Sequence, residues 1–185
     1  LALVSAGEEK VINTLTDDYH KWISSLYLDK DGKVWLGTYN GPATYDRKSG
    51  KTKRYDDHDS LSTRVYSFCE SVDGRMWIGT GEGLVCLDRQ NGKTTAYTEK
   101  DGLPSDVIKD IQEGNDGNLW IATLNGLSRF NPATATFKNY YQHDGLQENE
   151  FNSKASYKAL DGKLYFGGIK GLTAFYPHIV DQRAH

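Results

Sequence analysis

The sequence predicts an all-β fold built from four-stranded antiparallel blades, in a partial β-propeller of about four blades. The first observation is a repeat, since Asp-Gly pairs begin at positions 31, 73, 116 and 161, in steps of 42, 43 and 45 residues. The second is an aromatic residue four positions after each Asp. The third is the lack of any extended helical periodicity. A repeat of this length is typical of propellers and other repeat architectures.

Every copy of the repeat carries the same residue types at fixed offsets. The aromatic position is filled by Trp35, Trp77, Trp120 and Tyr165. A Gly follows six residues later, and in the first three copies a Tyr lies 20 residues after the Trp, with an Asp four residues beyond it. Because insertions fall only between the copies, each copy is expected to be one structural block.

Each complete block is expected to hold four strands, which in the first block are residues 22–28, 33–38, 43–46 and 52–55. The turns between them carry Asp-Gly, Asn-Gly or Ser-Gly pairs, which tolerate the positive φ of tight hairpins. The second strand is apolar on both faces, unlike a strand with one face in water. Sheets that are covered on both faces are expected to stack as propeller blades.

The repeat predicts one continuous propeller domain. Residues 1–20 are predicted to be the C-terminal half of a blade, followed by blades at 21–62, 63–105 and 106–148. A final three-stranded blade is predicted at 149–177, with a tail at 178–185.

Composition argues against several classes of partner and site. The net charge is −3 and no basic stripe occurs, so we expect no nucleic acid partner. No apolar run approaches the roughly 18 residues of a membrane-spanning helix. Cys69 and Cys86 are expected on the first and third strands of one block, roughly 10 Å apart at about 4.8 Å per strand. That separation is too long for a disulfide, so both are predicted to be buried thiols.

No metal site, cofactor or catalytic site is predicted. The Asp-Gly turns lack the later ligands of a calcium loop, above all a bidentate Glu. His58 and His143 each precede the Asp of a long loop, but they are expected two blades apart, too far to share an ion. No Ser, Cys or His lies in a recognisable nucleophile motif. Two pairs of carboxylates, Asp56 with Asp57 and Glu148 with Glu150, are assigned to surface loops rather than to a general acid/base pair.

The motif Asp-Gly-x-x-Trp-Ile-Gly-Thr-x-x-Gly-Leu, followed by Asp-Gly-Leu, resembles the two-component-regulator propeller repeat over nearly the whole chain. Pro42, Ala122 and Tyr165 depart from it at positions that are structural. Residues 144–152 and 164–177 resemble the last blade before the immunoglobulin-like stalk of that family. The resemblance implies a C-terminal fragment of the periplasmic sensor of a hybrid histidine kinase or a membrane-bound diguanylate cyclase.

The resemblance therefore implies a non-enzymatic sensor in the periplasm, as part of a membrane-anchored receptor that responds to a small molecule or an oligosaccharide. Any kinase or cyclase activity would lie outside the chain. Two alternatives remain open: a scaffold that binds other proteins, and a propeller lyase of the streptogramin-lyase type, which uses a similar Gly-x-x-Trp blade motif.

Blade topology predicts which face binds a ligand. In antiparallel blades, the turns between the second and third strands share a face with the long loops between blades. Variable polar residues on such loops are common in recognition. The candidate ligand-binding residues are Tyr39, Asn40, His58, Arg64, Glu82, Lys100, Asn125, His143, Asn149 and Lys170. The structural residues are Trp35, Trp77, Trp120, Tyr165, Gly37, Gly79 and Gly167, with each Gly expected to admit a side chain from the neighbouring blade.

The number of strands raises the question of closure. The family ring of seven blades needs about 28 strands, and the 17 expected here would form an open arc. Its apolar end faces favour self-association, most simply as a two-fold dimer. The alternative is a compact four-bladed monomer in which residues 1–16 pair with residues 163–176.

Overall fold

The computed structural model describes residues 2–4, 11–14, 22–55 and 59–180. Within this part of the chain the regular structure is β-strand, apart from the four-residue helix α1 (Pro177–Val180) and three short 3-10 turns. No helix in the described residues is long and apolar enough to cross a membrane.

Three antiparallel sheets of four strands and one of three follow one another along the chain. The first sheet holds β3 (Ile23–Leu28), β4 (Val34–Thr38), β5 (Gly41–Tyr45) and β6 (Thr52–Arg54), and the second holds β7 (Val65–Glu70), β8 (Met76–Thr80), β9 (Leu84–Leu87) and β10 (Thr94–Tyr97). The third sheet holds β11 (Ile108–Glu113), β12 (Leu119–Thr123), β13 (Gly126–Asn131) and β14 (Thr136–Tyr140). The fourth sheet holds three strands, β15 (Phe151–Lys158), β16 (Leu164–Gly168) and β17 (Gly171–Phe175). This confirms the predicted all-β propeller fold.

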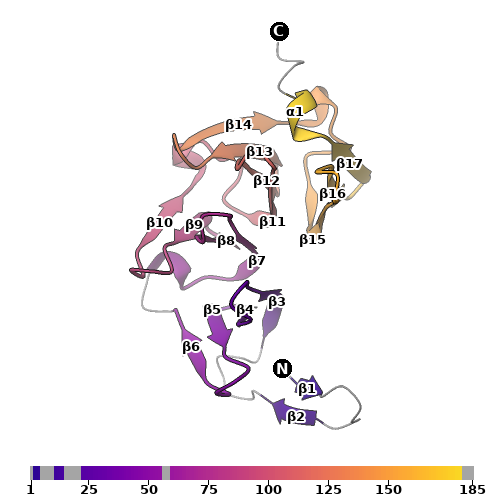
Figure 1. Ribbon diagram of the computed structural model, residues 1–185. Coiled ribbons are helices and arrows are strands. Elements are labelled where there is room, and N and C mark those ends of the chain that lie inside the picture. Colours follow the sequence, from indigo (N-terminus) through magenta and orange to yellow (C-terminus); the bar gives the residue numbers. More distant parts are fainter. Residues whose placement is uncertain (1, 5–10, 15–21, 56–58, 181–185) are drawn as a thin grey trace.

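The blades stand side by side in a curved row (Figure 1). Their first strands β3, β7, β11 and β15 line the concave side, and neighbouring first strands are in contact. The last strands β6, β10 and β14 lie at the outer edge. At the other end of the row, β1 (Ala2–Val4) and β2 (Val11–Thr14) pair only with each other among the described residues. The alternative pairing of residues 1–16 with residues 163–176 is therefore not formed by these strands.

The core lies between the blades, where the Trp of each blade packs on the next blade. Trp35, Trp77 and Trp120 are at most 1% exposed. Trp77, for example, packs with Ile108 and Ile121 of the third blade. The Tyr that recurs 20 residues later packs on the same indole, with ring centroids 5.2, 6.3 and 5.6 Å apart in the three blades. The repeated offsets of the sequence are thus contacts within and between blades.

Tyr165 occupies the Trp position of the fourth blade but is only half-buried. In the described structure no blade follows it, so its ring lacks the cover that Trp77 receives from the third blade. On the same sheet Tyr157 is 62% exposed and Leu172 is 61% exposed. The repeat position is therefore buried in the core in the three blades that carry Trp and only half-buried in the blade that carries Tyr165.

The Gly two residues after the aromatic leaves room for other side chains. A Cβ on Gly79 would lie 2.6 Å from Ile108 of the next blade and 2.6 Å from the Ser67 hydroxyl of its own blade. At Gly37 the Ser25 hydroxyl of the same blade is nearer than Val65 of the next. At Gly167 the neighbours come from Ala155 of its own blade alone. A side chain of the neighbouring blade therefore helps to explain the Gly at positions 37 and 79, but not the Gly at position 167.

Cys69 and Cys86 are both free and buried, on β7 and β9 with β8 between them. Burial raises the pKa of Cys69 to about 12 and also raises that of Cys86.

We expect neither thiol to react with iodoacetamide at pH 8 in the folded protein, because the thiolate is the nucleophile. With a pKa near 12, the thiolate of Cys69 is about 10⁻⁴ of the total at that pH. Mass spectrometry of the native and urea-unfolded protein checks this. Labelling at equal rates in the two states would contradict the burial of these side chains.

Candidate ligand-binding face

The turns between the second and third strands are fixed by a buried Thr. The Thr38 hydroxyl donates to the Gly41 carbonyl at 2.8 Å and accepts from the Asn40 amide at 3.0 Å. Thr80 and Thr123 make the same pair of bonds in the next two blades. Each turn therefore presents its two tip residues to solvent in a defined conformation. The exposed apolar side chains at these tips are Tyr39, Leu124 and Ile169.

The fourth turn is held differently, because Gly168 replaces the Thr. The side chain of Gln147 fills the space beside Gly168 and accepts a hydrogen bond from the Lys170 amide at 2.8 Å. The Lys170 ammonium lies 2.6 Å from Glu148 and holds the pKa of that carboxyl below its usual value. Lys170 is thus engaged within its own blade.

Side chains from three blades meet at this face in what we call the aromatic–cation cluster, made of Trp22, Tyr39, Arg64, Tyr66 and Lys109. The Arg64 guanidinium carbon lies 4.2 Å from the ring centroid of Tyr39 and 4.7 Å from that of Tyr66. The Lys109 ammonium lies 5.8 Å from the Tyr66 centroid. Trp22 packs edge-on against Tyr39 at 6.1 Å.

Four members of the cluster lie at the start of a blade, and the fifth, Tyr39, lies in the Thr38-fixed turn between β4 and β5. Trp22 and Arg64 immediately precede β3 and β7, and Tyr66 and Lys109 are the second residues of β7 and β11. The Arg64 carbonyl accepts a hydrogen bond from the Gly81 amide in the β8–β9 turn at 3.0 Å, which ties its backbone to the blade. The cluster therefore rests on strand ends and on one hydrogen-bonded turn rather than on free loops.

The structure brings Tyr39 and Arg64 of the predicted face into direct contact. Asn149 accepts from the Gln142 amide at 2.7 Å and so closes its own loop. His143 stacks on Tyr141 and lies 3.4 Å from Asp144. His58 lies outside the described residues. Among the remaining predicted residues, Asn40, Glu82 and Asn125 lie at the tips of turns between strands, and Lys100 lies in a 3-10 turn.

Sequence analysis missed Trp22, Tyr66 and Lys109. Trp22 was assigned to the first strand, although it occupies the same place before that strand as Arg64 does in the second blade. Comparing this position among the copies singles out Trp22 and Arg64, because it holds Trp22, Arg64, Val107 and Glu150 while the strands that follow it repeat. It does not indicate Tyr66 or Lys109.

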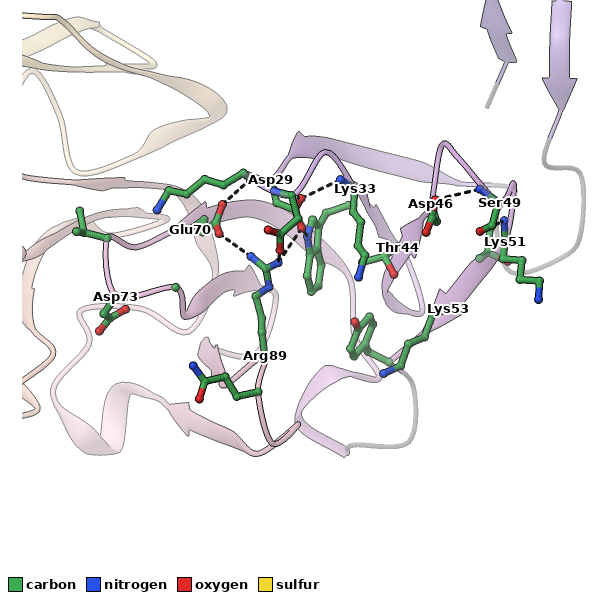
Figure 2. A pocket seen from close by; sticks show the side chains of 18 residues that line it. Asp29, Lys33, Thr44, Asp46, Ser49, Lys51, Lys53, Glu70, Asp73 and Arg89 are labelled. Atoms are coloured by element: carbon green, nitrogen blue, oxygen red, sulfur yellow. Dashed lines mark hydrogen bonds and ion pairs between the residues drawn. The ribbon is translucent and has the colours of Figure 1, made fainter.

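The opposite face, which carries the Asp-Gly turns, has a pocket of about 830 Å³ between the first two blades (Figure 2). Arg89 of the second blade lies at its wall and pairs with Glu70 at 2.5 Å, with Asp29 at 3.2 Å and with Asp31. Lys51 and Lys53 line the first-blade side of the pocket (Figure 2).

Asp29 in this pocket has its hydrogen-bonding capacity filled by the protein. It accepts from the Trp35 indole at 2.9 Å and from the amides of Asp31 and Lys33 at 3.0 and 2.8 Å. The second buried carboxylate of the network, Glu70, also accepts from the Lys30 amide at 2.9 Å. We therefore assign the Arg89 network to joining the two blades rather than to binding a ligand. In the described part of the chain, His, Cys, Asp and Glu form no group of three suited to a metal ion.

Comparison with known proteins identifies the repeat. The sequence model of the two component regulator propeller matches residues 20–40, 59–82 and 102–125. The chain contains two-component-regulator propeller repeats. All five residues of the aromatic–cation cluster lie in these three repeats. No curated protein matches the sequence significantly.

Solved structures share the propeller fold. The extracellular domain of the hybrid two-component system BT3049 from B. thetaiotaomicron is 28% identical, with a TM-score of 0.83 over 97% of this chain and 25% of that one. The corresponding domain of BT4673 from the same organism is 22% identical, with a TM-score of 0.75 over 89% and 25%. A virginiamycin B lyase from Staphylococcus aureus is 17% identical, with a TM-score of 0.68 over 86% and 57%. The chain thus spans a quarter of the length of the two extracellular domains.

Proposed function

We propose that the chain is part of a ligand-sensing propeller in the extracellular or periplasmic region of a two-component receptor, and that it responds to a carbohydrate. The two-component-regulator repeats support the receptor assignment, as does the 28% identity to an extracellular domain of a hybrid two-component system. We propose a binding role without catalysis, because the aromatic–cation cluster supplies rings and cations but contains no carboxylate, Ser, Cys or His.

The observation that carries the ligand assignment is the exposed aromatic pair at the cluster. Trp22 is 68% exposed and Tyr39 is 46% exposed, although large aromatic side chains usually bury most of their area. An aromatic ring that is apolar on its face and held at a rigid edge suits the apolar face of a sugar ring. The planes of the two rings lie at 67° to each other, so a ligand would meet two differently oriented aromatic surfaces rather than one flat surface.

We expect Trp22→Ala to weaken binding of the cognate oligosaccharide about tenfold or more, since stacking on one aromatic ring contributes about 1–3 kcal/mol in related contacts. Isothermal titration calorimetry with a panel of oligosaccharides measures this. Leu160→Ala, which truncates a fully exposed apolar side chain in an Asp-Gly turn of the opposite face, is the matched control. Equal affinities for the two variants would contradict the assignment of the site.

We also propose that the isolated chain self-associates as a dimer through the outer face of the fourth blade. That face shows Tyr157 and Leu172 to solvent and holds Tyr165 at the position where the other blades pack on a neighbour. Sedimentation equilibrium at micromolar concentration is expected to give a mass above 20.8 kDa. Leu172→Lys should shift the protein towards monomer, whereas Leu124→Lys on the ligand-binding face should not. A wild-type monomer would contradict the proposal.

A further inference from the structure

Arg64 lacks the ion pair that three other arginines form in the described structure. Arg75, Arg89 and Arg129 each pair with a carboxylate. Arg64 forms no ion pair with any described residue, and its Nε is buried without a hydrogen-bond partner. Buried polar atoms in proteins are nearly always bonded, and an exception calls for an explanation. The guanidinium charge also has no counter-charge among the described residues, and an anionic ligand that reaches its outer nitrogens would supply one.

The guanidinium is also held in place before any ligand arrives. Tyr39 and Tyr66 both lie against it, with centroids at 4.2 and 4.7 Å, and they come from two neighbouring blades. Such stacking fixes the plane of the fork, so less side-chain entropy is lost when the fork binds. The planar fork matches the geometry of a carboxylate, which it can bind through two parallel hydrogen bonds.

A second cation approaches one of the rings that Arg64 contacts. Lys109 of the third blade approaches Tyr66, the ring that Arg64 also contacts, and it too forms no ion pair with a described residue. Two like charges near one ring repel each other, and the attraction of both to a bound anion would offset that repulsion. The site therefore favours an anionic group, and Trp22 stands at its edge to contact the rest of the molecule.

We propose that the aromatic–cation cluster binds an acidic saccharide, with its carboxylate held by Arg64 and Lys109 and a sugar face packed on Trp22. This inference rests on the proposed carbohydrate-sensing function and adds the charge of the ligand. It implies that esterifying the carboxyl group removes the main polar contact while leaving the sugar face intact.

The test uses calorimetry with an array of uronic acid oligosaccharides, their methyl esters, their neutral counterparts and sulfated oligosaccharides. We expect the acids to bind and the esters to bind about tenfold to a hundredfold more weakly, the range of one charge-assisted contact. Arg64→Gln and Lys109→Gln should lose the preference for acid over ester. Arg64→Lys should keep part of it, because the charge remains and the fork is lost. Lys93→Gln, which removes one positive charge in a turn of the opposite face, should leave binding unchanged.

The outcomes separate this inference from the function on which it rests. Tight binding of neutral sugars or esters, unaffected by Arg64→Gln, overturns the acidic ligand and leaves carbohydrate sensing in place. Binding of sulfated but not carboxylated oligosaccharides overturns the carboxylate assignment. Binding of no saccharide overturns both. Circular dichroism melts of each variant show that a lost affinity is not a lost fold.

Discussion

Trp77→Ala is expected to lower the free energy of unfolding by about 3–5 kcal/mol, the range for large aromatic truncations in a core. The Trp77 side chain is completely buried between the second and third blades, among Ile108, Ile121 and Phe130. Its indole nitrogen has no hydrogen-bond partner, so the expected loss comes from apolar contacts and from the cavity that remains. A cavity at this position also loosens the contact between two blades.

Urea denaturation followed by circular dichroism measures the effect. Lys93→Ala is the control, because Lys93 is exposed in the β9–β10 turn and its loss is expected to change stability by at most about 0.5 kcal/mol. Tyr165→Ala is a second comparison at the same repeat position, where the ring is only half-buried and the cost should be smaller. Similar losses for Trp77→Ala and Lys93→Ala would refute the burial of Trp77.

The fold was predictable because its contacts repeat. The interval between Trp77 and Tyr97 recurs in three blades, and the structure shows the two rings packed together. Two Asp residues of the long loops likewise close short turns, since Asp101 accepts from the Thr98 amide and Asp144 from the Tyr141 amide, each at 2.8 Å. A contact that is made in three blades produces the same residue spacing three times in one sequence, and that repetition alone is enough to predict the contact.

The candidate site was only partly predictable, because it is made by residues that do not repeat. Topology placed Tyr39 and Arg64 on one face, but their contact joins a turn of one blade to the start of the next. It depends on side-chain directions that the repeat does not encode. Lys109 reaches Tyr66 from yet another blade. Such contacts occur once in the chain and appear only when the blades are placed in space.

On the opposite face, the Arg89 network is another set of contacts that occurs once and that the repeat could not predict. The residues 29–32 predicted a hairpin turn, which the structure contains, yet Asp29 also bonds the Trp35 indole and pairs with Arg89. The corresponding residues of the next two blades are Ser71 and Gly114, and there the Trp indole nitrogens have no partner. The Asp at position 29 is thus a departure from the repeat that strengthens one interface between blades.

Arg89→Ala is expected to lower the free energy of unfolding by about 3–5 kcal/mol, because it leaves buried carboxylates without their cation. The side chains of Asp29 and Glu70 are 0% and 3% exposed, and Arg89 itself is 18% exposed. Chemical denaturation of the variant measures the loss. Removal of one partner of a buried ion pair is much more costly than the pair itself is stabilising, since the remaining charge has lost both water and its counter-charge.

Asp31→Asn supplies the matched control, because the Asp31 side chain contacts the same guanidinium but is 65% exposed. Exposed ion pairs contribute about 0–1 kcal/mol, so this variant should be nearly as stable as the wild type. The double variant Arg89→Met with Glu70→Gln should recover part of the stability lost in Arg89→Ala, since the charge and its counter-charge leave together. If Arg89→Ala is no more costly than Asp31→Asn, the network does not join the blades, and the pocket beside it becomes a candidate for ligand binding in its own right.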